Sequence, residues 1–270
     1  MRSKFMLLKK VFRQTVAAIK INKKIFLLLL ALQLIFASLL TFALFRTIPP
    51  ATEEARKALE FIEAAENAPA EEGPIRLQNP YFLATTAKKM YGHFRNAGFW
   101  SAILFLIFNP SIWVLSLRIV YPPGKAQALR TLITTGVISL IFVLVLAQIG
   151  IVNLKSALVD LDDGSPFPFI SSSVVALIIL ILTPVALSLS QKKPKELFQL
   201  WIKTIAFRPL KIIGISLLIA AALLFIAAFA FLTAEISLIL DIIAVALLLF
   251  AIVFLRLFFI ASIREISKTI

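Results

Sequence analysis

The chain contains no cysteine and only one histidine, His93, among its 270 residues. Disulfides, thiolate metal sites and cysteine nucleophiles are therefore excluded, and zinc or heme sites have almost no ligands to draw on. None of the eight glycines belongs to a G-x-G-x-x-G or Walker-type phosphate loop. The hydrolase motifs G-x-S-x-G and H-E-x-x-H are absent as well. The sequence therefore predicts no catalytic, cofactor-binding or metal site.

Charged residues are also scarce, at 16% of the chain, whereas a soluble domain carries about a quarter. Hydrophobic residues make up 60%, and the mean hydropathy is +0.97. A surface with so few polar residues must face lipid, which predicts an all-α polytopic membrane protein. The formal net charge is +14. In such a protein this excess indicates basic inner loops and attraction to anionic lipid, rather than binding of nucleic acid.

Six segments are apolar over the roughly 20 residues that a helix needs to cross the hydrocarbon core. The first is too long for the apolar region of a signal peptide, and it is expected to be a retained anchor. The predicted spans are residues 25–45, 98–117, 132–151, 170–189, 212–231 and 238–260.

The distribution of lysine and arginine predicts the orientation of these spans. The leader 1–24 and the connection 118–131 contain basic residues and no acid, and the connection 190–211 contains six basic residues against Glu196 alone. The outer connection 152–169 is acidic, with Asp160, Asp162 and Asp163. The positive-inside rule therefore places both ends, including the tail 261–270, on the cytoplasmic side of the cell membrane.

A weak internal repeat accompanies this pattern. Phe12, Val16 and Ile19 share one helical face, and Phe198, Ile202 and Ile205 recur 186 residues later. Both stretches are basic and run into a span, which is typical of interfacial helices whose lysines reach lipid headgroups. A shorter stretch precedes residue 132, so the spans would form three hairpins. The alternative is that any basic segment beside a membrane looks amphipathic. The expected headgroup contacts are Lys9, Lys10, Lys20, Lys23, Lys24, Lys192, Lys193, Lys203, Arg208 and Lys211.

The outer connection 46–97 is the largest segment outside the predicted spans. Pro49 and Pro50 are expected to end the first span, because proline removes a helical hydrogen bond. Thr52 with the two following acids predicts a new short helix up to about residue 66. Aromatic residues then precede and open the second span, as in the aromatic belt of membrane proteins.

Two prolines inside spans are candidates for a functional site. Asn109-Pro110 lies midway along the second predicted span, and Thr183-Pro184 lies in the inner half of the fourth. Paired interruptions at corresponding positions can indicate a transport site. The alternative, which the sequence favours, is that both prolines are packing kinks.

Charged and amide side chains within the spans are the other candidates. Asp241 lies one turn inside the sixth span and Arg256 one turn from its inner end, about 22 Å apart along the helix. Ionisable groups in a membrane are costly and often functional. The favoured alternative is that Asp241 stays at the outer headgroups and Arg256 extends to the inner ones. Gln33, Asn109 and Gln148 are expected to form interhelical hydrogen bonds.

The leader ends in Ile21-Asn22-Lys23-Lys24-Ile25-Phe26 and continues into a leucine-rich span. This arrangement resembles uncharacterised multi-pass membrane proteins of archaeal genomes. The resemblance covers the first helix and the architecture, and it implies no substrate.

Three functions remain open on the sequence. The first is a non-enzymatic scaffold or complex subunit that contacts anionic lipid and other membrane subunits. The second is a small transporter built around Pro110, Pro184 and Asp241. The third, and the least supported, is a lipid-acting enzyme, for which Glu53 and Glu54 would be the only carboxylate pair.

Overall fold

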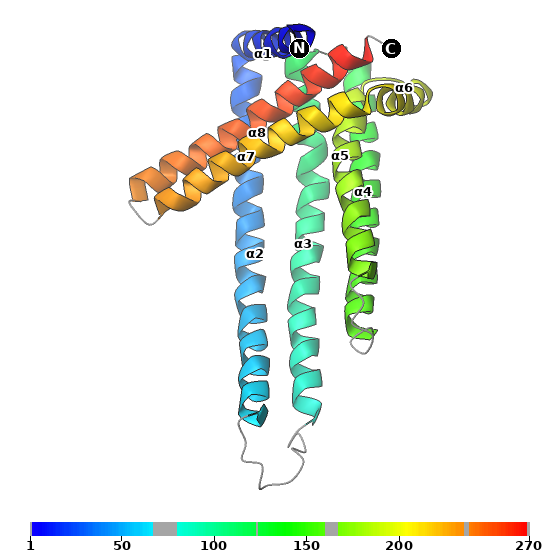
Figure 1. Cartoon of the computed structure of the whole chain (residues 1–270). Coiled ribbons are helices and arrows are strands. Elements are labelled where there is room, and N and C mark those ends of the chain that lie inside the picture. Colours follow the sequence, from blue (N-terminus) through cyan, green and yellow to red (C-terminus); the bar gives the residue numbers. More distant parts are fainter. Residues whose placement is uncertain (1, 67–79, 123, 160–166, 235–237, 269–270) are drawn as a thin grey trace. The chain divides into compact units, whose positions relative to one another are not determined.

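A computed structural model describes residues 2–66, 80–122, 124–159, 167–234 and 238–268. Every regular element in these ranges is a helix (Figure 1). The chain divides into two compact units, of which unit 1 comprises residues 1–34 with 106–270 and unit 2 comprises residues 35–105. The helices are α1 (Arg2–Ile21), α2 (Lys23–Glu66), α3 (Pro80–Val120), α4 (Lys125–Val159), α5 (Phe167–Leu189), α6 (Pro194–Phe207), α7 (Pro209–Ala234) and α8 (Leu238–Ser267).

Five of these helices, α2, α3, α4, α7 and α8, are long and apolar enough to cross a membrane. In α5, the corresponding apolar stretch with described side chains is shorter, Val174–Leu189. The helical class of the prediction and several of its membrane-length segments are therefore confirmed. Large hydrophobic side chains remain exposed along these helices, as expected where lipid replaces water; examples are Leu144, Leu177, Leu217, Phe225 and Leu247.

The main core of unit 1 forms where α5, α7 and α8 meet. Val185 and Leu189 of α5 pack with Ile212 and Ile215 at the start of α7. The end of α8 contributes Phe259, Ile263 and Ile266 to the same cluster, and α6 covers it with partly buried side chains. The sixth span was predicted to end at residue 260 and to be followed by a cytoplasmic tail, whereas α8 continues to Ser267 and buries its apolar face in this core.

Helices α7 and α8 form a hairpin whose two arms lie side by side (Figure 1). Only the start of α7 and the end of α8 contribute to the core shared with α5. At 1.5 Å per residue the 26 residues of α7 extend about 39 Å, and the 30 of α8 about 45 Å. Both are long enough to cross the hydrocarbon region with considerable tilt.

Helices α1 and α6 are the two amphipathic helices predicted from the repeat, and both are separate from the apolar helix that follows. The stripe that each helix buries against the protein is not the apolar stripe that the repeat predicts for the membrane interface. In α1 the fully buried residues are Val11 and Thr15, whereas Phe12 is 52% exposed. In α6 Thr204 is buried, whereas Phe198 is 57% exposed. Each helix therefore has a protein-facing stripe and a second apolar stripe that stays partly uncovered. Phe12 of this stripe also contacts Phe254 of α8, and Ile205 also packs against the core.

The third predicted interfacial stretch is not a separate element. Residues 125–131 form the first turns of α4, which continues without a break to Val159. Thr131 and Thr135 donate side-chain hydrogen bonds to the carbonyls of Gln127 and Thr131, four residues earlier. The donor groups of these hydroxyls are therefore satisfied within the helix.

In unit 2, the first helix does not end at the double proline. α2 continues through Pro49 and Pro50 to Glu66, so the predicted break and restart at Thr52 are wrong. The residues after the prolines favour helix, and three ion pairs join Glu53 and Glu60 to Arg56, and Glu54 to Lys57. Pairs at this spacing stabilise a helix. The centres of the Phe61 and Phe82 rings lie 4.8 Å apart, so that the last turns of α2 contact the first turns of α3.

Candidate functional site

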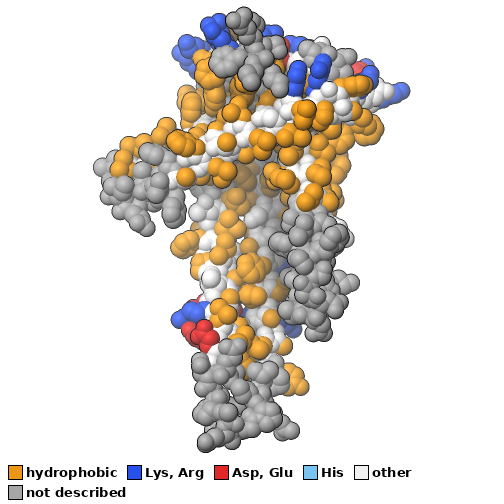
Figure 2. Space-filling model, in the orientation of Figure 1, with side chains coloured by type: hydrophobic (Ala, Val, Ile, Leu, Met, Phe, Trp, Pro, Cys, Tyr) orange, Lys and Arg blue, Asp and Glu red, His pale blue; other side chains and the backbone are white. Residues whose placement is uncertain are grey.

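Ten basic side chains surround α1 and α6 in unit 1, and we refer to them as the basic rim. Figure 2 shows lysine and arginine side chains gathered around these helices, while hydrophobic side chains cover α7 and α8. Most of the rim is exposed, but Arg208 and Lys211 are half-buried at the junction of α6 and α7. The basic rim consists of Lys9, Lys10, Lys20, Lys23, Lys24, Lys192, Lys193, Lys203, Arg208 and Lys211.

A buried glutamine connects the segments behind this rim. Gln191, directly after α5, donates from Nε2 to the backbone carbonyl of Tyr121, 3.1 Å away. Its Oε1 accepts a hydrogen bond from Arg264 of α8. Its backbone carbonyl accepts from Gln127 at 3.2 Å and from Arg130 at 2.9 Å, both on α4. Gln191 therefore links the end of α3, the start of α4 and the ends of α5 and α8. These contacts hold in place the helix ends that lie behind the basic rim.

A second set of contacts attaches α1 to the same end of unit 1. Lys10 forms an ion pair of 2.7 Å with Glu265 of α8, and Lys268 binds the other oxygen of that carboxylate at 2.9 Å. The hydrogen bond with Glu265 raises the pKa of Lys268 above its ordinary value. Asn22, between α1 and α2, donates to the carbonyl of Ile119 at 3.1 Å. Polar contacts thus hold α1 against α3 and α8.

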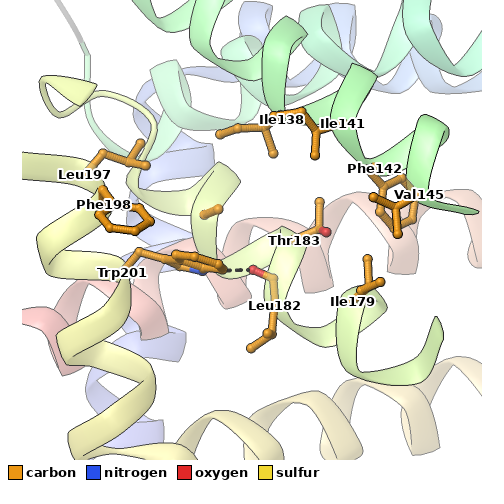
Figure 3. Close-up of a pocket in the computed structure, with 11 residues that line it drawn as sticks. Ile138, Ile141, Phe142, Val145, Ile179, Leu182, Thr183, Leu197, Phe198 and Trp201 are labelled. Carbon is orange, nitrogen blue, oxygen red and sulfur yellow. Dashed lines mark hydrogen bonds between the residues drawn. The ribbon is translucent and has the colours of Figure 1, made fainter. Parts of the chain in front are cut away.

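An apolar pocket of about 380 Å³ lies between α4, α5 and α6 (Figure 3). Ile138 and Phe142 come from α4, and Phe198 and Trp201 from α6. The indole Nε1 of Trp201 donates to the carbonyl of Leu182 at 3.3 Å, which attaches α6 to the side of α5. With a wall that is almost wholly apolar, the pocket can accept hydrocarbon but offers little to a polar substrate.

The predicted proline sites lie within continuous helices. Pro110 is buried in α3, and the preceding Asn109 donates to Ser139 of α4 at 2.8 Å, the interhelical bond expected for this amide. Pro184 lies inside α5, and its carbonyl accepts the Ser188 hydroxyl at 2.7 Å. Neither Pro110 nor Pro184 lines the two pockets described in this section.

Arg256, which the sequence favoured as extending to the inner headgroups, contacts Gln33 of α2 and Trp113 of α3. Its Nη2 donates to the Gln33 side chain at 3.1 Å, and its guanidinium lies 5.8 Å from the centre of the Trp113 ring. Its Nη1 is enclosed and has no hydrogen-bond partner among the described residues. Gln33 thus forms the predicted interhelical bond, whereas Gln148 is exposed on α4. Asp241 belongs to α8, but its side chain lies outside the described residues, as do Asp160, Asp162 and Asp163.

Unit 2 contains a groove of its own, with a volume of about 630 Å³. Leu39 and Phe42 of α2 and Leu104 of α3 form its apolar part, and Arg46 and His93 lie along it. The only histidine of the chain thus faces a groove rather than open surface. The carboxylates of Glu53 and Glu54 form ion pairs with Arg56 and Lys57 along α2, and pairs at this spacing stabilise a helix.

Four residues that build the site were not predicted: Tyr121, Gln191, Arg264 and Glu265. Gln191 and Tyr121 directly follow apolar helices, and Arg264 and Glu265 are a charge pair at the end of another. Polar residues at the same end of neighbouring apolar helices can meet when the helices pack, so their shared position at helix ends was the available signal.

No protein-family model, no curated protein and no solved structure matches the chain.

Proposed function

We propose that the chain is a non-enzymatic scaffold or complex subunit of the cell membrane that binds anionic lipid through the basic rim. The six predicted spans form three hairpins, and both termini lie on the cytoplasmic side. The rim then faces the inner leaflet, where anionic lipids attract lysine and arginine by about 1 kcal/mol each.

The main support for this proposal is the set of polar contacts that hold the helix ends together behind the basic rim. Gln191 joins four segments, and Lys10 with Glu265 attaches α1 to α8. These contacts fix the place of basic residues that would repel one another in a compact protein. A rigid basic surface binds anionic headgroups without a cost for ordering its own backbone.

The partly uncovered apolar stripes of α1 and α6 support the same conclusion. Phe12 and Phe198 stay exposed beside lysines, although each helix already packs its other face on the protein. A helix with a lysine-rich face and an apolar face lies in the plane of the membrane interface. The long exposed apolar surfaces of α4 and α7 offer contact to lipid or to other membrane subunits.

Lipid retention tests the proposal. The full chain is purified from a mild detergent containing equal amounts of phosphatidylglycerol and phosphatidylcholine, and the retained lipids are quantified. We expect enrichment of phosphatidylglycerol, and loss of it when Lys9, Lys20, Lys23 and Lys24 are changed to Gln. The matched control replaces Lys88 and Lys89 of unit 2, which are exposed and outside the rim. A chain without lipid preference that purifies as a partner-free monomer and transports a solute would contradict the proposal.

A small transporter is a second candidate, favoured by Arg256. Its enclosed Nη1 has no hydrogen-bond partner within the described part of the chain, and such a group in a span can serve an anion. Chloride efflux from liposomes tests this candidate. The transporter reading predicts efflux by the wild type and its loss in Arg256→Gln, Asp241→Asn and Pro184→Ala. The absence of chloride efflux from liposomes that contain the wild type would exclude the transporter.

A further inference from the structure

The basic rim contains one pocket whose wall combines cations with an aromatic ring. It has a volume of about 330 Å³ and lies where the end of α5, α6 and the end of α8 meet. Lys192, Arg264 and Lys268 line it together with Tyr121. Leu189 and Leu200 form its apolar wall. Arg264 and Lys268 were not among the predicted headgroup contacts. The pocket therefore adds two basic residues beside the rim that the sequence did not indicate.

The charge balance of this pocket favours an anion. Three of its lining residues are cations, and none of the described residues that line it is acidic. The nearby carboxylate of Glu265 is shared between Lys268 and Lys10. Cations that converge on one partly enclosed space raise the local concentration of anions there, because the low-dielectric wall focuses their field.

The arginine of the pocket is held in place before any ligand arrives. Arg264 donates to the Gln191 side chain, and its guanidinium lies 3.9 Å from the centre of the Tyr121 ring. The Lys268 ammonium lies 5.9 Å from the same ring centre. Gln191 in turn fixes the Tyr121 backbone. A planar guanidinium on a fixed support is suited to bidentate contact with phosphate, and little side-chain entropy is lost on binding.

We propose that this pocket binds the phosphate group of an anionic membrane lipid, with Arg264 as the fixed contact and Lys192 and Lys268 as flexible ones. The glycerol end of the lipid then lies against Leu189 and Leu200. A lipid is favoured over free phosphate because an apolar wall accompanies the cations, and because the apolar α5, α7 and α8 meet beside the pocket. The inference rests on the proposed function, since it requires the basic rim to face lipid headgroups.

The test compares three double variants of the full chain, which each lose two positive charges. Lys192→Gln/Lys268→Gln removes the flexible contacts but keeps Arg264, which also holds Gln191. Lys20→Gln/Lys24→Gln removes charge elsewhere in the rim, and Lys88→Gln/Lys89→Gln removes it from unit 2. Each protein is titrated with phosphatidylglycerol in phosphatidylcholine micelles, and bound lipid is counted by native mass spectrometry. A parallel arm measures thermal stability in inorganic phosphate against chloride of equal ionic strength.

We expect the pocket variant to lose about tenfold in affinity for the tightest phosphatidylglycerol, and the other two variants to keep that tight site. Equal losses in both rim variants would overturn the pocket while leaving the general binding of lipid by the rim intact. No preference for phosphatidylglycerol in the wild type would overturn the pocket and the proposed function together. In another outcome, inorganic phosphate stabilises the wild type but not the pocket variant, while neither protein prefers a lipid. That result would assign the site to free phosphate and overturn the lipid proposal.

Discussion

At the scale of residues, the buried polar side chains decide how unit 1 is assembled. The sequence predicts spans that are nearly free of polar groups and are joined by a few interhelical hydrogen bonds. Asn109 and Gln33 form such bonds, as predicted. Gln191 was not predicted because its role depends on which helix ends meet around it. No local sequence pattern indicates which ends these are. A buried amide in a low-dielectric site is costly unless every partner is present.

Replacing Gln191 with Ala is expected to lower the free energy of unfolding by about 3 kcal/mol, since a charged and a neutral hydrogen bond are lost and the Tyr121 carbonyl is left unpaired. Unfolding by sodium dodecyl sulfate in mixed micelles measures the change. Gln14→Ala is the control, because Gln14 is exposed on α1 and its loss should cost almost nothing. Equal stability of the two variants would contradict the bracing role of Gln191.

Gln33 and Arg256 should behave as a coupled pair. Gln33→Leu leaves the enclosed guanidinium without its acceptor and is expected to cost about 2 kcal/mol. Adding Arg256→Met removes the charge that needed solvation, so the double variant should recover most of that stability. The same denaturant titration gives both values. If the two losses simply add, the side chains do not act on each other.

At the scale of elements, hydrophobic length and basic flanks predicted most of the helices, because these features are local in the chain. The amphipathic character of α1 and α6 was also predictable, but which face is buried was not. Both helices have apolar residues on two adjoining stripes, and only packing against α5 and α8 selects Val11 and Leu197 over Phe12 and Phe198. Proline misled the prediction at Pro49 and Pro50, where ion pairs and helix-favouring neighbours extend α2.

The attachment of α6 to α5 provides a test at this scale. Trp201→Phe keeps an aromatic ring in the pocket of Figure 3 but removes the donor to the Leu182 carbonyl. We expect amide hydrogen exchange in α6 to accelerate about fivefold, which corresponds to the loss of one hydrogen bond of about 1 kcal/mol, with little change in α4. Trp100→Phe in unit 2 is the matched control. Unchanged exchange in α6 would show that packing alone holds this helix.

At the scale of the whole molecule, an asymmetric charge distribution accompanies a set of membrane-length helices. The helical class could be read from composition, and five helices long and apolar enough to cross a membrane agree with it. The proposed six spans follow from the lengths of the apolar segments, and their proposed orientation follows from the distribution of lysine and arginine. In that proposed orientation the basic rim faces the inner leaflet, where lipid binding takes place.

The absence of cysteine from the native chain allows the most direct measurement of that topology. Single cysteines at Lys9, Lys195, Lys89 and Asp162 are labelled in intact cells with a membrane-impermeant maleimide, before and after permeabilisation. The account predicts that Lys89→Cys and Asp162→Cys react in intact cells, whereas Lys9→Cys and Lys195→Cys react only after permeabilisation. Labelling of all four positions on one side, or of the basic rim from outside, would contradict the six-span arrangement and the lipid-binding role built on it.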